Sequence, residues 1–70
     1  MEIYDYEVME NDLDKMFNEY REIMGTNNIT RYLFLFNNVS VLCYKYRDYP
    51  ICTMFKKLHD NIFTDIRNLK

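Results

Sequence analysis

The sequence predicts a small α+β domain in which two amphipathic helices pack on an antiparallel β-hairpin. Three observations support this prediction: a helical spacing of apolar residues in two segments, an aromatic and β-branched run between them, and two consecutive asparagines that divide this run. The 70 residues are expected to form a single compact domain, 1–70. A chain of this size buries only about 60% of the surface its unfolded form exposes, so it needs dense packing or a partner subunit.

The first eight residues, MEIYDYEV, are expected to add a third strand to the sheet. Asp5 and Glu7 would fall on one side of an extended chain, and Tyr4 and Tyr6 on the other, which is the period of a strand. The alternative is an irregular leader into the first helix.

Residues 12–24, DLDKMFNEYREIM, are predicted to form the first helix. Asn11 or Asp12 can accept hydrogen bonds from the free N–H groups of its first turn, and Gly25 can adopt the left-handed conformation that ends a helix. The apolar residues at helical spacing are Leu13, Met16, Phe17, Tyr20, Ile23 and Met24.

The middle of the chain, RYLFLFNNVSVLCYKY, is predicted to form a hairpin with strands 29–36 and 39–46 and a turn at Asn37-Asn38. Its β-branched and aromatic residues favour strands, and asparagine tolerates the positive φ of a two-residue turn. A helix would instead place five residues of lower helix propensity in succession, at 37–41. The alternative fold is a three-helix bundle.

Both faces of this hairpin are apolar, although an antiparallel sheet with one exposed face normally shows clean alternation. The helices are expected to cover the face that carries Phe34, Phe36, Val39 and Val41. The second face is then a candidate for binding another protein, because contiguous exposed apolar patches mark interfaces. It carries Ile29, Arg31, Leu33, Leu35, Leu42, Tyr44 and Tyr46. The alternative is that one of the two helices covers this face within the monomer.

Residues 50–70 are predicted to form the second helix. Pro50 is tolerated in a first turn because its missing N–H would have no helical partner there. Lys56, Asp60 and Arg67 lie away from the apolar stripe. The stripe consists of Ile51, Met54, Phe55, Leu58, Ile62, Ile66 and Leu69.

No pattern in the chain is typical of a catalytic, cofactor or metal site. Cys52 and His59 would lie about 10 Å apart along a helix, too far for a nucleophile and its base. The spacing of Cys43, Cys52 and His59 matches no compact zinc module. Gly25 is the only glycine, so the chain has no glycine-rich phosphate loop. We therefore expect a protein that is not an enzyme and holds neither cofactor nor metal.

The composition and the apolar segments indicate the origin of the protein and its location in the cell. Asn, Ile, Tyr and Lys are abundant while Ala and Gln are absent, as expected for an AT-rich genome such as that of a phage, a virus or a low-GC bacterium. No signal peptide is visible, and the longest apolar run, 32–36, is far shorter than the roughly 20 residues of a membrane span. We expect a cytoplasmic protein, in the host cytoplasm if it is viral, with reduced thiols and no membrane contact.

The net charge is −2, but residues 1–24 carry eight acids and two bases while residues 25–70 carry seven bases and three acids. This asymmetry can steer a charged partner. Glu7, Glu10 and Asp14 are the acids that we expect to take part, because closely spaced carboxylates can imitate phosphates and occupy the channel of a nucleic-acid-binding enzyme. The alternative is that the acidic residues are only the solvent-exposed side of the first strand and helix.

These features favour a non-enzymatic protein–protein interaction module, an accessory protein of a phage or virus that binds and inhibits a host protein. The apolar face would supply affinity, and the acids would supply approach and orientation. A homodimer through the same face is compatible with this function. The competing hypothesis is a small regulatory nucleic-acid-binding protein that uses Lys45, Arg47, Lys56 and Lys57, against which the net negative charge argues.

Overall fold

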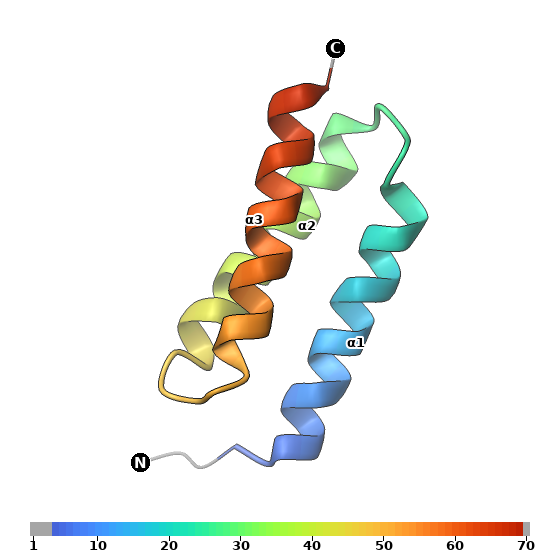
Figure 1. Ribbon diagram of the computed structural model, residues 1–70. Coiled ribbons are helices and arrows are strands. Elements are labelled where there is room, and N and C mark those ends of the chain that lie inside the picture. Colours follow the sequence, from blue (N-terminus) through green and yellow to red (C-terminus); the bar gives the residue numbers. More distant parts are fainter. Residues whose placement is uncertain (1–3, 70) are drawn as a thin grey trace.

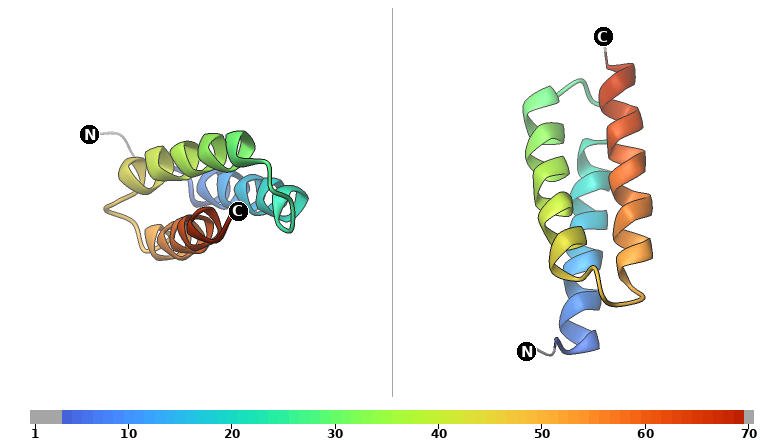
Figure 2. Two further views of the ribbon diagram at one scale, coloured as in Figure 1. Left: turned by 90° about the horizontal axis from the view of Figure 1, so that it is seen from above. Right: turned by 90° about the vertical axis from the view of Figure 1, so that its left-hand side faces the viewer.

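A computed structural model describes residues 4–69, and this part of the chain consists of three α-helices joined by two short connections (Figure 1). The helices are α1 Tyr6–Ile23, α2 Ile29–Lys45 and α3 Cys52–Asn68. They run alternately up and down, and α1 lies against the pair formed by α2 and α3 (Figures 1 and 2). The bundle is elongated, with principal extents of 43 × 17 × 16 Å.

The predicted α+β fold is therefore wrong, and the alternative, a three-helix bundle, is the one observed. Residues 4–69 contain no strand. Helix α2 continues through Asn37 and Asn38, so the hairpin 29–36/39–46 does not form. The predicted opening strand falls partly on residues 1–3, which lie outside the described residues, and from Tyr6 onward its residues belong to α1.

Burial of one face along its whole length explains why α2 is helical. Val39, in the middle of the asparagine-containing segment, has no exposed surface. Full burial of one such side chain contributes about 1.5–3 kcal/mol, whereas a residue of lower helix propensity costs at most about 0.7 kcal/mol. The Ser40 hydroxyl also finds a partner in the helix, because it donates to the carbonyl of Phe36 at 2.9 Å. The inner face of α2 consists of Tyr32, Leu35, Val39, Leu42 and Tyr46, the last of which is the C-cap.

The other two predicted helices are confirmed, with different starting points. Helix α1 begins at Tyr6, and Asp5 rather than Asn11 or Asp12 is its N-cap, accepting a hydrogen bond from the Glu7 N–H at 2.9 Å. Gly25 has a φ of 86°, the left-handed conformation expected after this helix. Helix α3 lies within the predicted range 50–70, with Pro50 in the turn before it.

Apolar side chains from all three helices meet along the bundle axis and form the core. α1 contributes Met9, Leu13, Met16 and Ile23; α2 and the connection after it contribute Tyr32, Leu35, Val39, Tyr46 and Ile51; and α3 contributes Phe55, Leu58 and Ile62.

Two tyrosine hydroxyls tie α1 to the rest of the bundle. The Tyr20 hydroxyl donates to Asp65 of α3, and the Tyr46 hydroxyl donates to Asp12 of α1, each at 2.6 Å. Burial, and then the hydrogen bond to Asp65, raise the pKa of Tyr20 to about 12. Burial and the bond to Asp12 likewise raise the pKa of Tyr46 well above its usual range. Both groups therefore act as protonated structural donors rather than as acids or bases near neutral pH.

Candidate protein interface

Helix α2 carries a second apolar stripe on the side away from the core. Phe34 and Tyr44 are each 69% exposed, and Leu33 and Val41 are 53% and 57% exposed. Residues two positions apart on a helix point about 200° away from each other, so Val41 and Val39 lie on opposite sides of α2. We call the exposed stripe, with residues Thr30, Leu33, Phe34, Asn37, Val41 and Tyr44, the outer face of α2.

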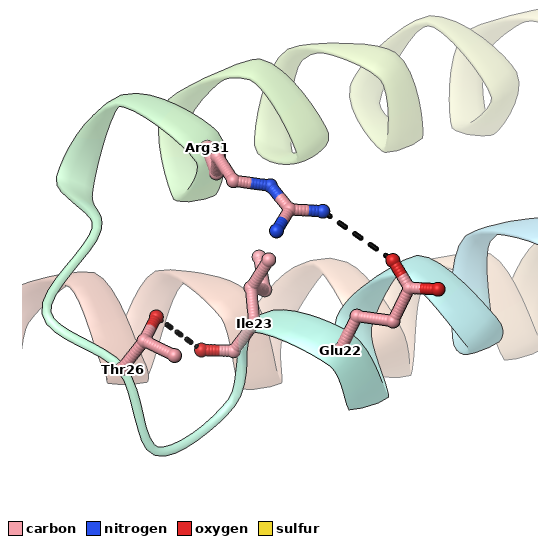
Figure 3. A network of polar contacts seen from close by, with 4 residues as sticks. All are labelled: Glu22, Ile23, Thr26 and Arg31. Atoms are coloured by element: carbon pink, nitrogen blue, oxygen red, sulfur yellow. Dashed lines mark hydrogen bonds and ion pairs between the residues drawn. The ribbon is translucent and has the colours of Figure 1, made fainter.

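The outer face is bordered by positive charge, because α2 contains no acid and carries Arg31 near one end and Lys45 at the other. The only acid that pairs with these two cations in the described residues is Glu22 of α1, whose carboxylate lies 3.4 Å from the Arg31 guanidinium (Figure 3). This ion pair bridges the α1–α2 connection, where the Thr26 hydroxyl also donates to the carbonyl of Ile23 at 2.6 Å (Figure 3). The pair is exposed, so its contribution to stability is small.

Arg47 holds the ring of Tyr44 at the end of the outer face. Its guanidinium lies 4.2 Å from the ring centroid and donates to the Tyr44 carbonyl at 2.9 Å. The arginine thus caps the last turn of α2 and restricts the exposed ring. Tyrosine and arginine are the residue types enriched at binding hot spots, and here they form a preordered pair.

Two shallow hollows flank the outer face. One, of about 370 Å³, lies between α1 and α2 and is bordered by Glu19, Glu22 and Phe34. The other, of about 350 Å³, lies between α2 and α3 and is lined by Leu33, Phe36, Asn37, Ser40, Phe63 and Ile66. Apolar side chains of a partner could enter both hollows, so the candidate surface is broader than the stripe itself.

The acids Glu7, Glu10 and Asp14 are exposed on α1, but they lie on a different side of the bundle. Asp12, which contacts α2 through Tyr46, is two residues from both Glu10 and Asp14. These two acids consequently point away from α2, because a two-residue step turns a helix by about 200°. The predicted acidic and apolar parts of the interface therefore do not form one continuous surface.

The residues of the second hairpin face, which we assigned to partner binding, separate into two groups. Leu33, Tyr44 and Arg31 are exposed on the side of α2 that faces solvent, whereas Leu35 and Tyr46 are buried in the core and Leu42 is half-buried. Ile29, at the start of α2, is 43% exposed.

The strand interpretation also assigned Phe34 and Val41 to the core, although both are exposed. The signal that it missed is a pair of interleaved stripes, each with alternating spacings of three and four residues. One stripe runs through positions 32, 35, 39, 42 and 46, and the other through positions 30, 34, 37, 41 and 44. A helix that is apolar on two opposite sides reads as a continuous apolar run, which resembles buried strands.

Cys43 lies on α2, and Cys52 and His59 lie on α3. Cys43 and Cys52 are free thiols, and burial raises the pKa of Cys43. The Cys52 sulfur lies 3.6 Å from the carbonyl oxygen of Arg47, and the His59 ring packs on Phe36 with the ring centroids 4.2 Å apart. Among residues 4–69, no group of three or more His, Cys, Asp or Glu side chains is placed to hold a metal ion.

The cations proposed for nucleic-acid binding are partly engaged within the chain. The Lys45 ammonium lies 5.2 Å and 5.4 Å from the ring centroids of Tyr4 and Tyr46, and Arg47 is stacked on Tyr44. Lys56 and Lys57 are exposed near the start of α3. Because cations at the end of α2 also complement the helix dipole there, their position has a structural explanation.

Comparisons of the chain with protein-family models, with curated proteins and with solved structures find no match. Within residues 4–69, none of the helices combines the length and the apolar character that a membrane crossing requires.

Proposed function

We propose that this chain is a non-enzymatic protein-interaction module whose docking surface is the outer face of α2. The observation that carries the proposal is the exposure of four large apolar side chains, Leu33, Phe34, Val41 and Tyr44, along one side of a helix. Single exposed apolar residues are common on protein surfaces, but several large ones gathered on one side of a helix are typical of an interface.

Energetic considerations support this assignment. Large aromatic side chains bring roughly 150–250 Å² each to an interface, and Phe34 and Tyr44 are both 69% exposed. The Arg47 stack restricts Tyr44 before binding, which lowers the entropy lost when the ring is immobilised. The inner face of α2 already stabilises the bundle, so a partner can cover the outer face without disturbing the core.

We further propose that the partner is a host protein, which the chain inhibits in the cytoplasm of the host cell. The AT-rich composition supports a phage or viral origin, and the free thiols Cys43 and Cys52 suit a reducing compartment. Glu7, Glu10 and Asp14 would steer a basic partner from a distance, because their side of α1 faces solvent.

Affinity capture with matched variants tests the proposal. The immobilised chain is incubated with a lysate of its natural host, in parallel with Leu33→Asp, Tyr44→Ala and the control Val8→Asp. Val8 is 50% exposed on α1, so its substitution introduces the same charge at similar exposure outside the outer face of α2. Proteins captured by the native chain and the control but lost with both α2 variants support the docking surface; unchanged capture with both variants contradicts it.

The competing hypothesis, nucleic-acid binding through Lys45, Arg47, Lys56 and Lys57, predicts a gel shift that weakens steeply with salt, because phosphate contacts release counterions. A shift at 50 mM salt that is abolished by Lys56→Glu with Lys57→Glu, and unaffected by Leu33→Asp, would favour nucleic acid. Absence of a shift at 50 mM salt removes this hypothesis.

A further inference from the structure

The two hollows beside the outer face of α2 differ in charge. The hollow between α1 and α2 is bordered by three charged residues, Glu19, Glu22 and Arg31, whereas the residues that line the hollow between α2 and α3 carry no charge. The guanidinium of Arg67 lies beside this second hollow, because it is 5.8 Å from the ring centroid of Phe63, a lining residue. We propose that the outer face binds an amphipathic helix of the partner that carries a basic residue on one edge of its apolar stripe and an acidic residue on the other. The inference rests on the proposed function, because it names the chemistry of the segment that the docking surface binds.

The spacing of the exposed side chains on α2 fits a helical partner. Residues of the outer face follow one another in steps of three and four, and the two hollows lie on either side of this ridge. Ridges of one helix pack into the grooves of another, so a helix laid along α2 places its own side chains in both hollows. Many helices share such an apolar spacing, and the charges beside it therefore decide which partner fits.

On the α1 side, one carboxylate lacks a cation. Arg31 is paired with Glu22 at 3.4 Å, so these two charges balance each other. Glu19 is half-buried at the edge of the same hollow, and neither Lys15, one turn earlier, nor any other cation of residues 4–69 forms an ion pair with it. The exposed ring of Phe34 lines this hollow as well. A lysine or arginine of the partner can thus bond to the Glu19 carboxylate while its side chain lies on the Phe34 ring.

On the α3 side, one cation lacks an acid. Arg67 is exposed in the last turn of α3 and forms no ion pair with any of the described residues. Asp65, two positions earlier, accepts the Tyr20 hydroxyl and so points toward α1. Asp60 lies about two turns away, and its carboxylate is 3.7 Å from a ring nitrogen of His59. A carboxylate of the partner can therefore pair with Arg67 while a neighbouring apolar side chain enters the hollow.

The remaining charges limit the position and the nature of the partner helix. Arg47 is stacked on Tyr44, and Lys45 is the last residue of α2, so both cations lie at the far end of the helix. The α2 residues that line the two hollows all fall within 30–40, so the proposed segment covers about three turns at the start of α2. A second copy of α2 does not meet the charge requirement, because it contains no acid to pair with Arg67.

Binding of three synthetic helical peptides to the full chain tests the inference. The peptides share one apolar stripe of about three turns and differ only at its edges: lysine on one edge and glutamate on the other, glutamate on both, or lysine on both. Each exposed ion pair changes affinity by up to about fivefold, and a uniform peptide replaces one pair with a repulsion. Fluorescence anisotropy at 50 mM salt is expected to show that the mixed peptide binds about tenfold more tightly than either uniform peptide. Equal binding of the mixed peptide and a uniform one, or no binding of any, overturns the inference.

Two charge reversals make the test specific to the hollows. Glu19→Lys makes both hollows positive, so this variant is expected to bind the glutamate peptide most tightly, and Arg67→Glu makes both negative, so it is expected to bind the lysine peptide most tightly. The control Arg21→Glu reverses a charge two residues from Glu19, where the side chain points to another side of α1, and should still bind the mixed peptide most tightly. Leu33→Asp should weaken the binding of all three peptides. Far-ultraviolet circular dichroism verifies that each variant is helical; peptide preferences that ignore the reversals, or binding unchanged by Leu33→Asp, overturn the inference.

Failure of this inference is distinct from failure of the proposed function. A captured host protein that is lost with Leu33→Asp but unaffected by Glu19→Lys and by Arg67→Glu keeps the docking surface and removes the charge requirement. Peptide preferences that follow the charges, together with host-protein capture unchanged by Leu33→Asp and Tyr44→Ala, keep the peptide site and remove the proposed function. A native chain that is dimeric by sedimentation equilibrium and does not bind the mixed peptide makes a second copy the occupant, which overturns the inference.

Discussion

The inner and outer faces of α2 are built from nearly the same residue types but have different environments. Val39 on the inner face has no exposed surface, while Val41 on the outer face is 57% exposed. Leu35 and Leu33 form a second such pair, and Tyr46 and Tyr44 a third. Because the members of each pair are two positions apart, they differ in direction rather than in chemistry. The comparison shows that the neighbouring helices, not the residue type, decide which face stabilises the fold and which is available for binding.

The largest expected difference in unfolding free energy is between the variants Leu35→Ala and Leu33→Ala. Leu35 is buried in the core, so its truncation should cost about 2–5 kcal/mol of unfolding free energy. Leu33 is exposed, and the same change should alter the unfolding free energy by no more than about 0.5 kcal/mol. Urea denaturation at a concentration where the chain is monomeric measures both. Equal losses for the two variants would contradict the assignment of the faces.

A smaller difference in unfolding free energy is expected between the variants Tyr46→Phe and Tyr44→Phe. The first change removes the hydroxyl that donates to Asp12 and leaves that carboxylate without the bond, which should cost about 1–3 kcal/mol. The second keeps the ring that Arg47 stacks on and should leave the unfolding free energy unchanged. Thermal unfolding followed by circular dichroism compares the two, and a loss for Tyr44→Phe would indicate a core contact at the outer face.

The loss of stability at alkaline pH tests the role of the Tyr20 hydroxyl, which donates to Asp65 between α1 and α3. Because the pKa of Tyr20 is raised to about 12 in the folded chain and is near 10 in an unfolded one, the unfolded chain releases its proton first. The contribution of this group is fully present below about pH 10 and is lost as the pH rises toward 12. Tyr20→Phe should lower the unfolding free energy at pH 8 and make its decline between pH 10 and 12 less steep. An unchanged slope in denaturation series at these pH values would contradict this role.

The smallest expected effect concerns Asn37, which is exposed on the outer face. Asn37→Ala replaces a residue of modest helix propensity with the best helix former, so the monomer should gain up to about 0.5 kcal/mol. Thermal unfolding at low concentration measures the gain. A loss of more than about 1 kcal/mol would mean that Asn37 has a structural contact within the monomer, and that the inner and outer faces are less separate than the burial pattern indicates.

The segments of α1 and α3 could be predicted from the sequence because each has one apolar stripe at helical spacing. The first turns of α1 were missed, because Tyr6 to Val8 continue the alternation of apolar and polar residues that begins at Tyr4, which is typical of a strand. Asp5, Asn11 and Asp12 are all residue types that cap helices, so the sequence alone did not show which of them starts the helix. For α2 the sequence predicted a hairpin, because Asn37-Asn38 is turn-like and two opposite apolar stripes conceal the helical period. Leu33 and Tyr44, which the sequence analysis assigned to the uncovered face, are both exposed.

From the amino-acid sequence alone one can infer the apolar and aromatic content, the charge asymmetry and the helices before and after the middle segment. The packing of the three helices establishes that residues 29–45 are helical and that Phe34 and Val41, rather than Leu35 and Tyr46, face solvent. The physical reason is that local propensities of a few tenths of a kcal/mol per residue are smaller than the stabilisation gained when Tyr32, Leu35 and Val39 are buried in the core shared with α1 and α3. That burial depends on helices distant in the sequence, which local patterns do not describe.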